Sequence, residues 1–206
     1  MIEMKRRPED REVFYRLFSP LMNAALKIWY NPKIINKENI PKGVPVIIAC
    51  NHVHLFDQCL TIAATNRVIH YMAKKEYFEG KLRPFFEAFG CISVDREKGT
   101  DIKSVKSALR VLKRGGAIGI FPEGTRNRTD KLLLKFKPGA VALAKKADAY
   151  IVPCGLTGDY SFRSKNLSIR YGKPFKVSDM TVEEGNIKLY NEVKKLVLEG
   201  KEANIA

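Results

Sequence analysis

VPVIIACNHVHLFD, residues 44–57, joins an apolar run directly to a polar cluster. Its first half, residues 44–50, is continuously apolar, which is typical of a strand buried on both faces of a sheet. Its second half, NHVHLFD, ends that run and leads into LFDQCLTIAAT, residues 55–65, a segment that suits a helix. A buried strand that turns at once into a helix predicts an α/β fold.

The same alternation continues along the chain on the C-terminal side of this stretch. We expect further strands at residues 68–73, 91–94, 117–121, 150–156 and 167–172. We expect further helices at residues 76–90 (broken near Pro84), 100–116, 137–147 and 183–199. Strands that alternate with helices predict a mixed, largely parallel sheet flanked by helices.

Unusual polar clusters follow three of the expected strands directly. They are NHVHLFD at residues 51–57, Asp95-Arg96, and PEGTR at residues 122–126. In open α/β sheets the ligand binds outside the carboxyl ends of the strands. We therefore expect these three loops to converge on one edge of the sheet and to carry the chemistry.

An amphipathic helix is expected near the N-terminus, in FYRLFSPLMNAALKIWY at residues 14–30. Pro20 is expected to kink this helix or to split it into a pair. Arg16, Lys27 and Pro20 make it a poor transmembrane span, so it either lies in a membrane interface or packs on the core. The charged start, residues 1–12, predicts that no signal peptide precedes the fold. We divide the chain into an N-terminal helical segment, residues 1–35, and an α/β domain, residues 36–206.

The net charge of +15 indicates an anionic partner. Residues 96–137 hold 12 basic and 4 acidic residues, so over half of the net charge lies in a fifth of the chain. Charge alone leaves nucleic acid open, but no pattern typical of a nucleic-acid-binding module accompanies it. The four cysteines have no ligand-like spacing, which favours buried thiols in a reducing compartment.

His52 and Asp57 are the candidate catalytic pair. Five residues apart on a regular helix, they would point about 140° away from each other, so they can meet only across a strand-to-helix junction. A carboxylate on one imidazole nitrogen fixes the tautomer and leaves the other nitrogen free as a base. His54, three residues before Asp57, is an alternative partner on spacing alone.

The PEGTR segment and two strand ends supply candidate anion ligands. Gly124 permits a tight turn, and Arg126 is by its chemistry a bidentate phosphate ligand. Glu123 could accept a hydrogen bond from a substrate hydroxyl or orient Arg126. Arg96 either pairs with Asp95 or points into the anion site, and Lys74 follows its strand in the same way. An ordinary glycine turn with an exposed ion pair remains the alternative for PEGTR.

Taken together, these segments resemble the glycerolipid acyltransferase family, in particular the bacterial 1-acylglycerol-3-phosphate acyltransferases. The resemblance rests on ordered blocks: N-H-x4-D at residues 51–57, G-x-I-x-V-D-R at 90–96, F-P-E-G-T-R at 121–126 and a V-P block at 151–155. The AKKE stretch at residues 73–76 is similar to a lysine-containing family segment. Four blocks in order are far more specific than any one of them.

The resemblance implies a role for each matching residue. His52 would be the base and Asp57 would orient it. Phosphate would be held by Lys74, Arg96 and Arg126, while the substrate site would also include Glu123, Gly124 and Thr125. The family often has Ser where this chain has His54, and only His52 has the spacing of the block, which favours His52 as the base.

The resemblance also implies the reaction and its partners. A fatty acyl group would pass from acyl-CoA or acyl-acyl carrier protein to the sn-2 hydroxyl of 1-acylglycerol 3-phosphate, without a metal, cofactor or nucleic acid. We expect peripheral or monotopic binding to the anionic cytoplasmic face of the cell membrane, with acyl carrier protein as a further candidate partner. The alternatives are another acceptor, such as glycerol 3-phosphate, or a non-enzymatic protein that binds anionic lipid or nucleic acid.

Overall fold

The computed structural model describes residues 12–95, 97 and 101–205. Its strands are β1 (Lys33–Ile35), β2 (Val46–Cys50), β3 (Ile69–Lys74), β4 (Ile92–Val94), β5 (Ala117–Ile120), β6 (Tyr150–Thr157) and β7 (Ser168–Tyr171). Its α-helices are α1 (Glu12–Trp29), α2 (Asp57–Ala63), α3 (Arg83–Ala88), α4 (Ile102–Lys113), α5 (Gly139–Ala147) and α6 (Val182–Glu202). Two short 3-10 helices, η2 (Lys37–Asn39) and η3 (Lys75–Phe78), complete the order.

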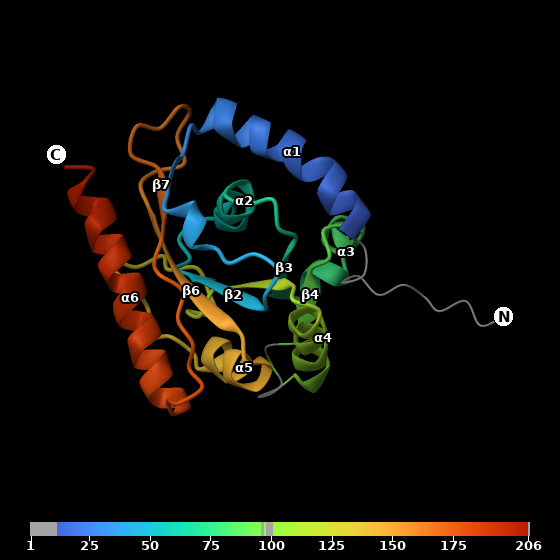
Figure 1. Ribbon diagram of the computed structural model, residues 1–206. Helices are drawn as coiled ribbons and strands as arrows, with labels where there is room; N and C mark the ends of the chain where they lie inside the picture. Colours follow the sequence, from blue (N-terminus) through green and yellow to red (C-terminus); the bar gives the residue numbers. More distant parts are fainter. Residues whose placement is uncertain (1–11, 96, 98–100, 206) are drawn as a thin grey trace.

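The strands form one sheet in the order β1-β7-β6-β2-β5-β3-β4. In this described sheet only the β6–β7 pair is antiparallel, so the predicted mixed, largely parallel sheet is confirmed. Helices α4, α5 and α6 cover one face, and α2 covers the other with α1 lying across it (Figure 1). The five strands from β6 to β4 run in parallel, and their carboxyl ends therefore share one edge.

Strand β2 lies at the centre of the sheet, and all five of its residues are buried. Successive side chains point to opposite faces. Ile47 and Ala49 join the core beneath α4, α5 and α6, and Val46, Ile48 and Cys50 join the core beneath α2. Each buried Val or Ile contributes about 1.5–3 kcal/mol relative to an exposed one. The apolar run at residues 44–50 is thus the strand between the two cores, and it fixes where residues 51–57 emerge.

Two N-terminal features differ in detail from the sequence expectation. The helix is not split at Pro20: α1 continues from Glu12 to Trp29 and curves over α2 (Figure 1). Pro20 is exposed, so water can solvate the carbonyl that its missing N–H leaves without a helical partner. Residues 33–35, the end of the expected N-terminal segment, form β1 beside β7 at the edge of the sheet.

The helix expected at residues 76–90 is broken, as predicted, but the break lies at residues 79–82, before Pro84. The structure has η3 and then α3, with Gly80 between them and Pro84 in the first turn of α3. Glycine disfavours a helix interior and proline disfavours the helical conformation of the residue before it, so both break the periodic pattern. All four cysteines are free thiols, with Cys50 and Cys154 buried opposite each other on β2 and β6.

Candidate active site

Loops from three neighbouring strands meet at the shared carboxyl edge. Residues 51–56 follow β2, residues 121–126 follow β5, and residues 158–167 follow β6. Because β6, β2 and β5 are adjacent, the first loop lies between the other two. The predicted convergence of the NHVHLFD and PEGTR segments is therefore observed.

The His52 and Asp57 side chains contact each other across the strand-to-helix junction. Nδ1 of His52 lies 2.7 Å from Oδ2 of Asp57. The Asp57 side chain is fully buried, whereas 17% of the His52 side chain is exposed. A carboxylate oxygen only accepts hydrogen bonds, so we assign the imidazole hydrogen to Nδ1. Nε2 is then an unprotonated nitrogen that can act as a base.

Hydrogen bonds to both oxygens stabilise the buried Asp57 carboxylate. Oδ2 also accepts from the backbone N–H groups of Val53, at 2.7 Å, and His54, at 2.8 Å. Oδ1 accepts from the Tyr160 hydroxyl at 2.5 Å. Asp57 is also the first residue of α2, where the helix dipole favours negative charge. These contacts offset the desolvation that an unpaired buried carboxylate would suffer.

His54 contributes its backbone, not its ring, to the Asp57 contacts. Its ring stacks on Tyr160, with centroids 3.9 Å apart, and its Nδ1 accepts a hydrogen bond from the N–H of Phe56. Of the two candidate histidines, His52 is therefore the one whose imidazole the structure pairs with Asp57.

The loop after β5 supports His52 from the other side. The backbone N–H of His52 donates to Oε1 of Glu123 at 2.7 Å, and the imidazole stacks on Phe121 with ring centroids 4.0 Å apart. The N–H of Asn127 donates to the carbonyl of His52 at 2.7 Å. These contacts fix the position of the backbone from which the imidazole projects.

Glu123 is buried and joins two loops. Its second oxygen, Oε2, accepts from the backbone N–H of Leu134 at 2.8 Å. Burial raises the pKa of the Glu123 carboxyl, and the N–H groups of Leu134 and His52 partly oppose that rise. Both carboxylate oxygens of Glu123 thus accept hydrogen bonds from backbone N–H groups in this structure. The substrate contact expected for Glu123 stays a prediction.

Two cationic residues, Arg126 and Lys137, belong to or lie over the turn at Gly124. Gly124 has φ +72°, and a methyl group there would come within 2.9 Å of Cε of Lys137, so the Lys137 side chain lies over the turn. Thr125 is exposed and Arg126 is half-buried. Within the described part of the chain, neither Arg126 nor Lys137 forms a side-chain hydrogen bond or ion pair.

The other expected phosphate ligands lie farther along the sheet. Lys74 ends β3, and its ammonium group contacts Oε1 of Glu76 at 2.9 Å, with no contact to the dyad among the described residues. Asp95 follows β4 and lies 3.8 Å from the ammonium group of Lys75. Arg96 lies outside the described residues, and so does its expected pairing with Asp95.

Tyr160 was not among the residues predicted for the site, and Phe121 had no predicted role. Tyr160 contacts Asp57 from a position 103 residues away, and no local pattern encodes that contact. One signal was available, because GDY at residues 158–160 follows the strand expected at 150–156. Because ligands bind outside the carboxyl ends of strands, that position would have predicted Tyr160 beside the active site.

A protein-family model described as Acyltransferase matches residues 31–157, the stretch that holds the dyad and the loop after β5. The chain belongs to the acyltransferase family. This membership shows that the protein is an enzyme, which decides against the non-enzymatic lipid- or nucleic-acid-binding alternative. The described residues of this acyltransferase form no group of three His, Cys, Asp or Glu side chains suited to a metal ion.

Two curated relatives and one solved structure are similar to the acyltransferase. A 1-acyl-sn-glycerol-3-phosphate acyltransferase of Bacillus subtilis is 33% identical over 80% of this chain and 84% of its own. One of Borreliella burgdorferi is 34% identical over 76% of this chain and 65% of its own. The crystal structure of the 1-acyl-sn-glycerophosphate (LPA) acyltransferase PlsC of Thermotoga maritima has a TM-score of 0.73 at 22% identity, covering 97% of this chain and 84% of that one. This structural likeness confirms the fold.

Proposed function

We propose that the acyltransferase transfers a fatty acyl group from a thioester to the sn-2 hydroxyl of 1-acylglycerol 3-phosphate, forming phosphatidate. The observation that carries this proposal is the His52–Asp57 pair, with Nδ1 occupied and Nε2 left as a base. The acceptor is supported by the names of the relatives from B. subtilis and B. burgdorferi, both of which are 1-acyl-sn-glycerol-3-phosphate acyltransferases.

In this mechanism the attacking oxygen belongs to the substrate. Nε2 of His52 takes the proton of the sn-2 hydroxyl as that oxygen attacks the thioester carbonyl. Asp57 stabilises the imidazolium that forms. The tetrahedral intermediate collapses with cleavage of the carbon–sulfur bond, and the proton on Nε2 passes to the departing thiolate. The enzyme forms no covalent bond with the acyl group.

We propose that the acceptor's phosphate binds near Arg126. Arg126 and Lys137 have no anionic partner among the described residues, and guanidinium groups bind phosphate bidentately. Arg96 and Lys74 are the further ligands implied by the family blocks. Lys74 would have to exchange its contact with Glu76 for the phosphate. Gly124 and Thr125, in the turn between Glu123 and Arg126, would border the glycerol.

We further propose that the acyltransferase binds the cytoplasmic face of the membrane peripherally through α1. Large apolar side chains on this helix are exposed: Val13, Phe14, Leu17, Phe18, Leu21, Ile28 and Trp29. Leu82 and Phe85, around the start of α3, are exposed as well. No helix in the described residues is long and apolar enough to cross a bilayer. An amphipathic helix with exposed aromatic and aliphatic bulk suits the interface between headgroups and acyl chains.

The acyl donor is either acyl-CoA or acyl-acyl carrier protein. Both are strongly anionic, and the net charge of +15 would attract either one. Purified enzyme given each donor in turn, with lysophosphatidate or glycerol 3-phosphate as acceptor, would identify both substrates. Transfer to glycerol 3-phosphate alone would replace the proposed acceptor and leave the family assignment intact.

The experiment that tests the proposed role of the dyad compares His52→Ala with His54→Ala. The first removes the base and should lower kcat by about a hundredfold to ten-thousandfold. The second keeps the backbone N–H that binds Asp57 and should retain far more activity. Circular dichroism and vesicle binding would check that both variants stay folded. A His52→Ala enzyme of near wild-type activity, beside an inactive His54→Ala enzyme, would refute the assignment.

A further inference from the structure

Tyr160 occupies a position at the active site that the proposed reaction has not yet used. Its hydroxyl donates to Oδ1 of Asp57, the oxygen turned away from the imidazole. The other oxygen, Oδ2, accepts from Nδ1 of His52 and from two backbone N–H groups of the loop after β2. Tyr160 therefore makes the contact to Asp57 that comes from outside this local loop.

The geometry points to Tyr160 as the positioning residue of the dyad, a role that rests on the proposed function of His52 and Asp57. The terminal torsion of an aspartate is broad, so contacts on one oxygen alone leave the carboxylate plane free to rock. A donor on Oδ1 fixes that plane and so fixes the direction in which Oδ2 meets the imidazole. Tyr160 acts on the base through Asp57 and does not touch the reacting atoms.

The Tyr160 ring is itself held on two sides. It stacks on His54 at an interplanar angle of 21°, and it meets Tyr30 edge-on with centroids 5.5 Å apart. An aromatic ring between two others has little freedom to rotate, so the hydroxyl is directed at Oδ1 before substrate arrives. Preorganised contacts of this kind lose little conformational freedom during turnover.

The loop that carries Tyr160 is fastened to the end of α1. The N–H of Arg163 donates to the carbonyl of Trp29 at 2.6 Å, and the Trp29 and Phe162 rings meet edge-on with centroids 5.0 Å apart. The position of the Tyr160 hydroxyl is thereby tied both to β6 and to the proposed membrane helix. The last turn of α1 thus supports the dyad as well as presenting apolar side chains.

Tyr160 also remains a hydrogen-bond donor across the working pH range. Burial and the adjacent Asp57 carboxylate raise the pKa of its hydroxyl far above the usual tyrosine range. A phenolate facing a carboxylate would be repelled, so the donor form is the one that suits this contact.

The test is Tyr160→Phe, which removes one oxygen atom and keeps the ring. We expect kcat to fall about tenfold, with KM for lysophosphatidate and for the acyl thioester unchanged. Tyr190→Phe on α6 is the matched control, because it removes a hydroxyl that has no hydrogen bond in the described structure and packs against the core on the other face of the sheet. A Tyr160→Phe enzyme with kcat within twofold of wild type, or with KM raised and kcat unchanged, would overturn the proposal.

A double-mutant cycle with Asp57→Asn separates positioning from a purely structural effect. If Tyr160 acts through the Asp57 carboxylate, Tyr160→Phe should lower kcat by less than about twofold once Asp57 is Asn. A tenfold loss in both backgrounds would show that Tyr160 acts independently of Asp57 and would overturn the proposal. Failure of the proposed function has its own signature, an active His52→Ala enzyme, and is therefore distinguishable from failure of the Tyr160 role.

Discussion

At the scale of single residues, the contacts of Asp57 explain the spacing of the N-H-x4-D block. The backbone between His52 and Asp57 has to turn so that the N–H groups of Val53 and His54 reach Oδ2 while the His52 imidazole reaches the same oxygen. A regular helix could not do this, because its N–H groups point along the axis and its side chains point outward. Five residues provide enough chain for the turn and let Asp57 begin α2.

A first prediction concerns Glu123, whose two oxygens each accept a backbone N–H. In Glu123→Gln only the amide oxygen can accept, so one buried N–H faces an NH2 group and loses its partner. We expect the variant to be less stable by about 1–3 kcal/mol at neutral pH. Urea unfolding measures this difference, and Glu199→Gln, at an exposed position on α6, is the matched control.

The same variant should show a pH dependence of defined sign. Burial raises the pKa of the Glu123 carboxyl in the folded protein, so the folded state holds its proton to higher pH than the unfolded chain. Binding of that proton by the folded state adds stability below the pKa that Glu123 has in the unfolded chain. This added stability is lost as pH rises through the pKa that Glu123 has in the folded protein. The stability deficit of Glu123→Gln should therefore grow as pH falls through this range. A deficit that shrinks in acid would contradict the prediction.

How far the site could be predicted depends on the sequence separation of its contacts. His52 and Asp57 are close in the chain, and their spacing together with an expected strand end was enough to bring them together. Tyr160 reaches Asp57 only because β6 lies beside β2, an adjacency that no short motif encodes. The bonding of Glu123 to backbone N–H groups was likewise not predictable, because the identity of a residue does not reveal which donors surround it.

At the scale of elements, α1 presents apolar side chains on two sides. Tyr15 and Leu26 are buried against the domain, whereas the large apolar residues on the outer side are exposed. A contiguous apolar surface of this kind marks an interaction site in a folded protein. The amphipathic period of α1 was predictable from the sequence, but its partner stayed open between membrane and core. The structure shows that the side of α1 with Tyr15 and Leu26 packs on the domain.

Short elements were harder to predict than long ones. The central strands and α4 were recognisable because apolar runs and helical periodicity extend over several residues. Strand β1 has three residues and pairs only with β7, so its residues carry no period that could distinguish it from a loop. The break between η3 and α3 was placed near Pro84, although Gly80 lies at the gap itself.

A second prediction tests the outer face of α1. Leu17→Glu/Leu21→Glu places two charges at positions that are 64% and 66% exposed, so the fold should tolerate both changes. We expect binding to lipid vesicles to weaken at least about tenfold, because each charge has to be desolvated at the interface. Ile187→Glu/Leu198→Glu on α6 is the matched control, since both residues are exposed apolar side chains on another element. Equal loss in the two double variants would contradict a specific role for α1.

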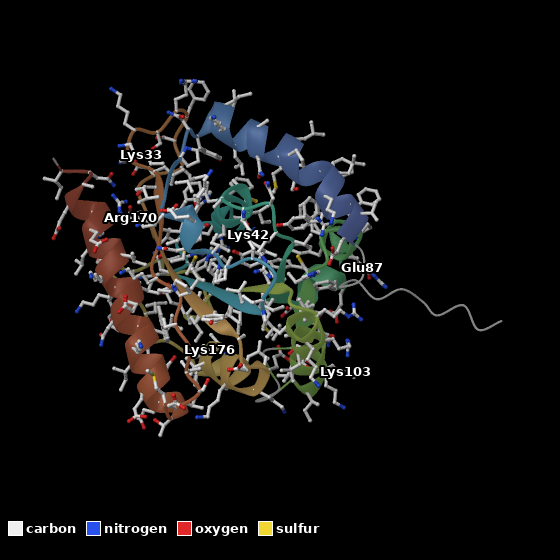
Figure 2. All side chains as sticks on the ribbon, viewed as in Figure 1. Lys33, Lys42, Glu87, Lys103, Arg170 and Lys176 are labelled. Carbon is white, nitrogen blue, oxygen red and sulfur yellow. The ribbon has the colours of Figure 1, made fainter. Side chains whose placement is uncertain are left out.

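At the scale of the whole molecule, basic residues are distributed over many elements. Figure 2 labels Lys33 on β1, Lys103 on α4, Arg170 on β7 and Lys176 beyond β7. The chain has 37 Lys and Arg residues against 22 Asp and Glu residues, so 15 cations have no carboxylate to match them. The field of such a molecule would attract the proposed anionic partners, lipid and acyl thioester, over distances set by the ionic strength. The exposed apolar residues of α1, by contrast, act only on contact.

The last prediction separates these two contributions to membrane binding. On vesicles of phosphatidylcholine and phosphatidylglycerol, salt should weaken binding, because each basic residue near an anionic surface contributes about 1 kcal/mol that is lost by screening. Binding should level off at the affinity for phosphatidylcholine alone, which apolar insertion of α1 maintains. The Leu17→Glu/Leu21→Glu variant should instead lose binding altogether at high salt, since neither contribution remains. Flotation over a series of salt concentrations measures binding of the wild type to both kinds of vesicle and of the double variant to the mixed vesicles. Wild-type binding that does not change with salt would show that the net charge plays no part at the membrane.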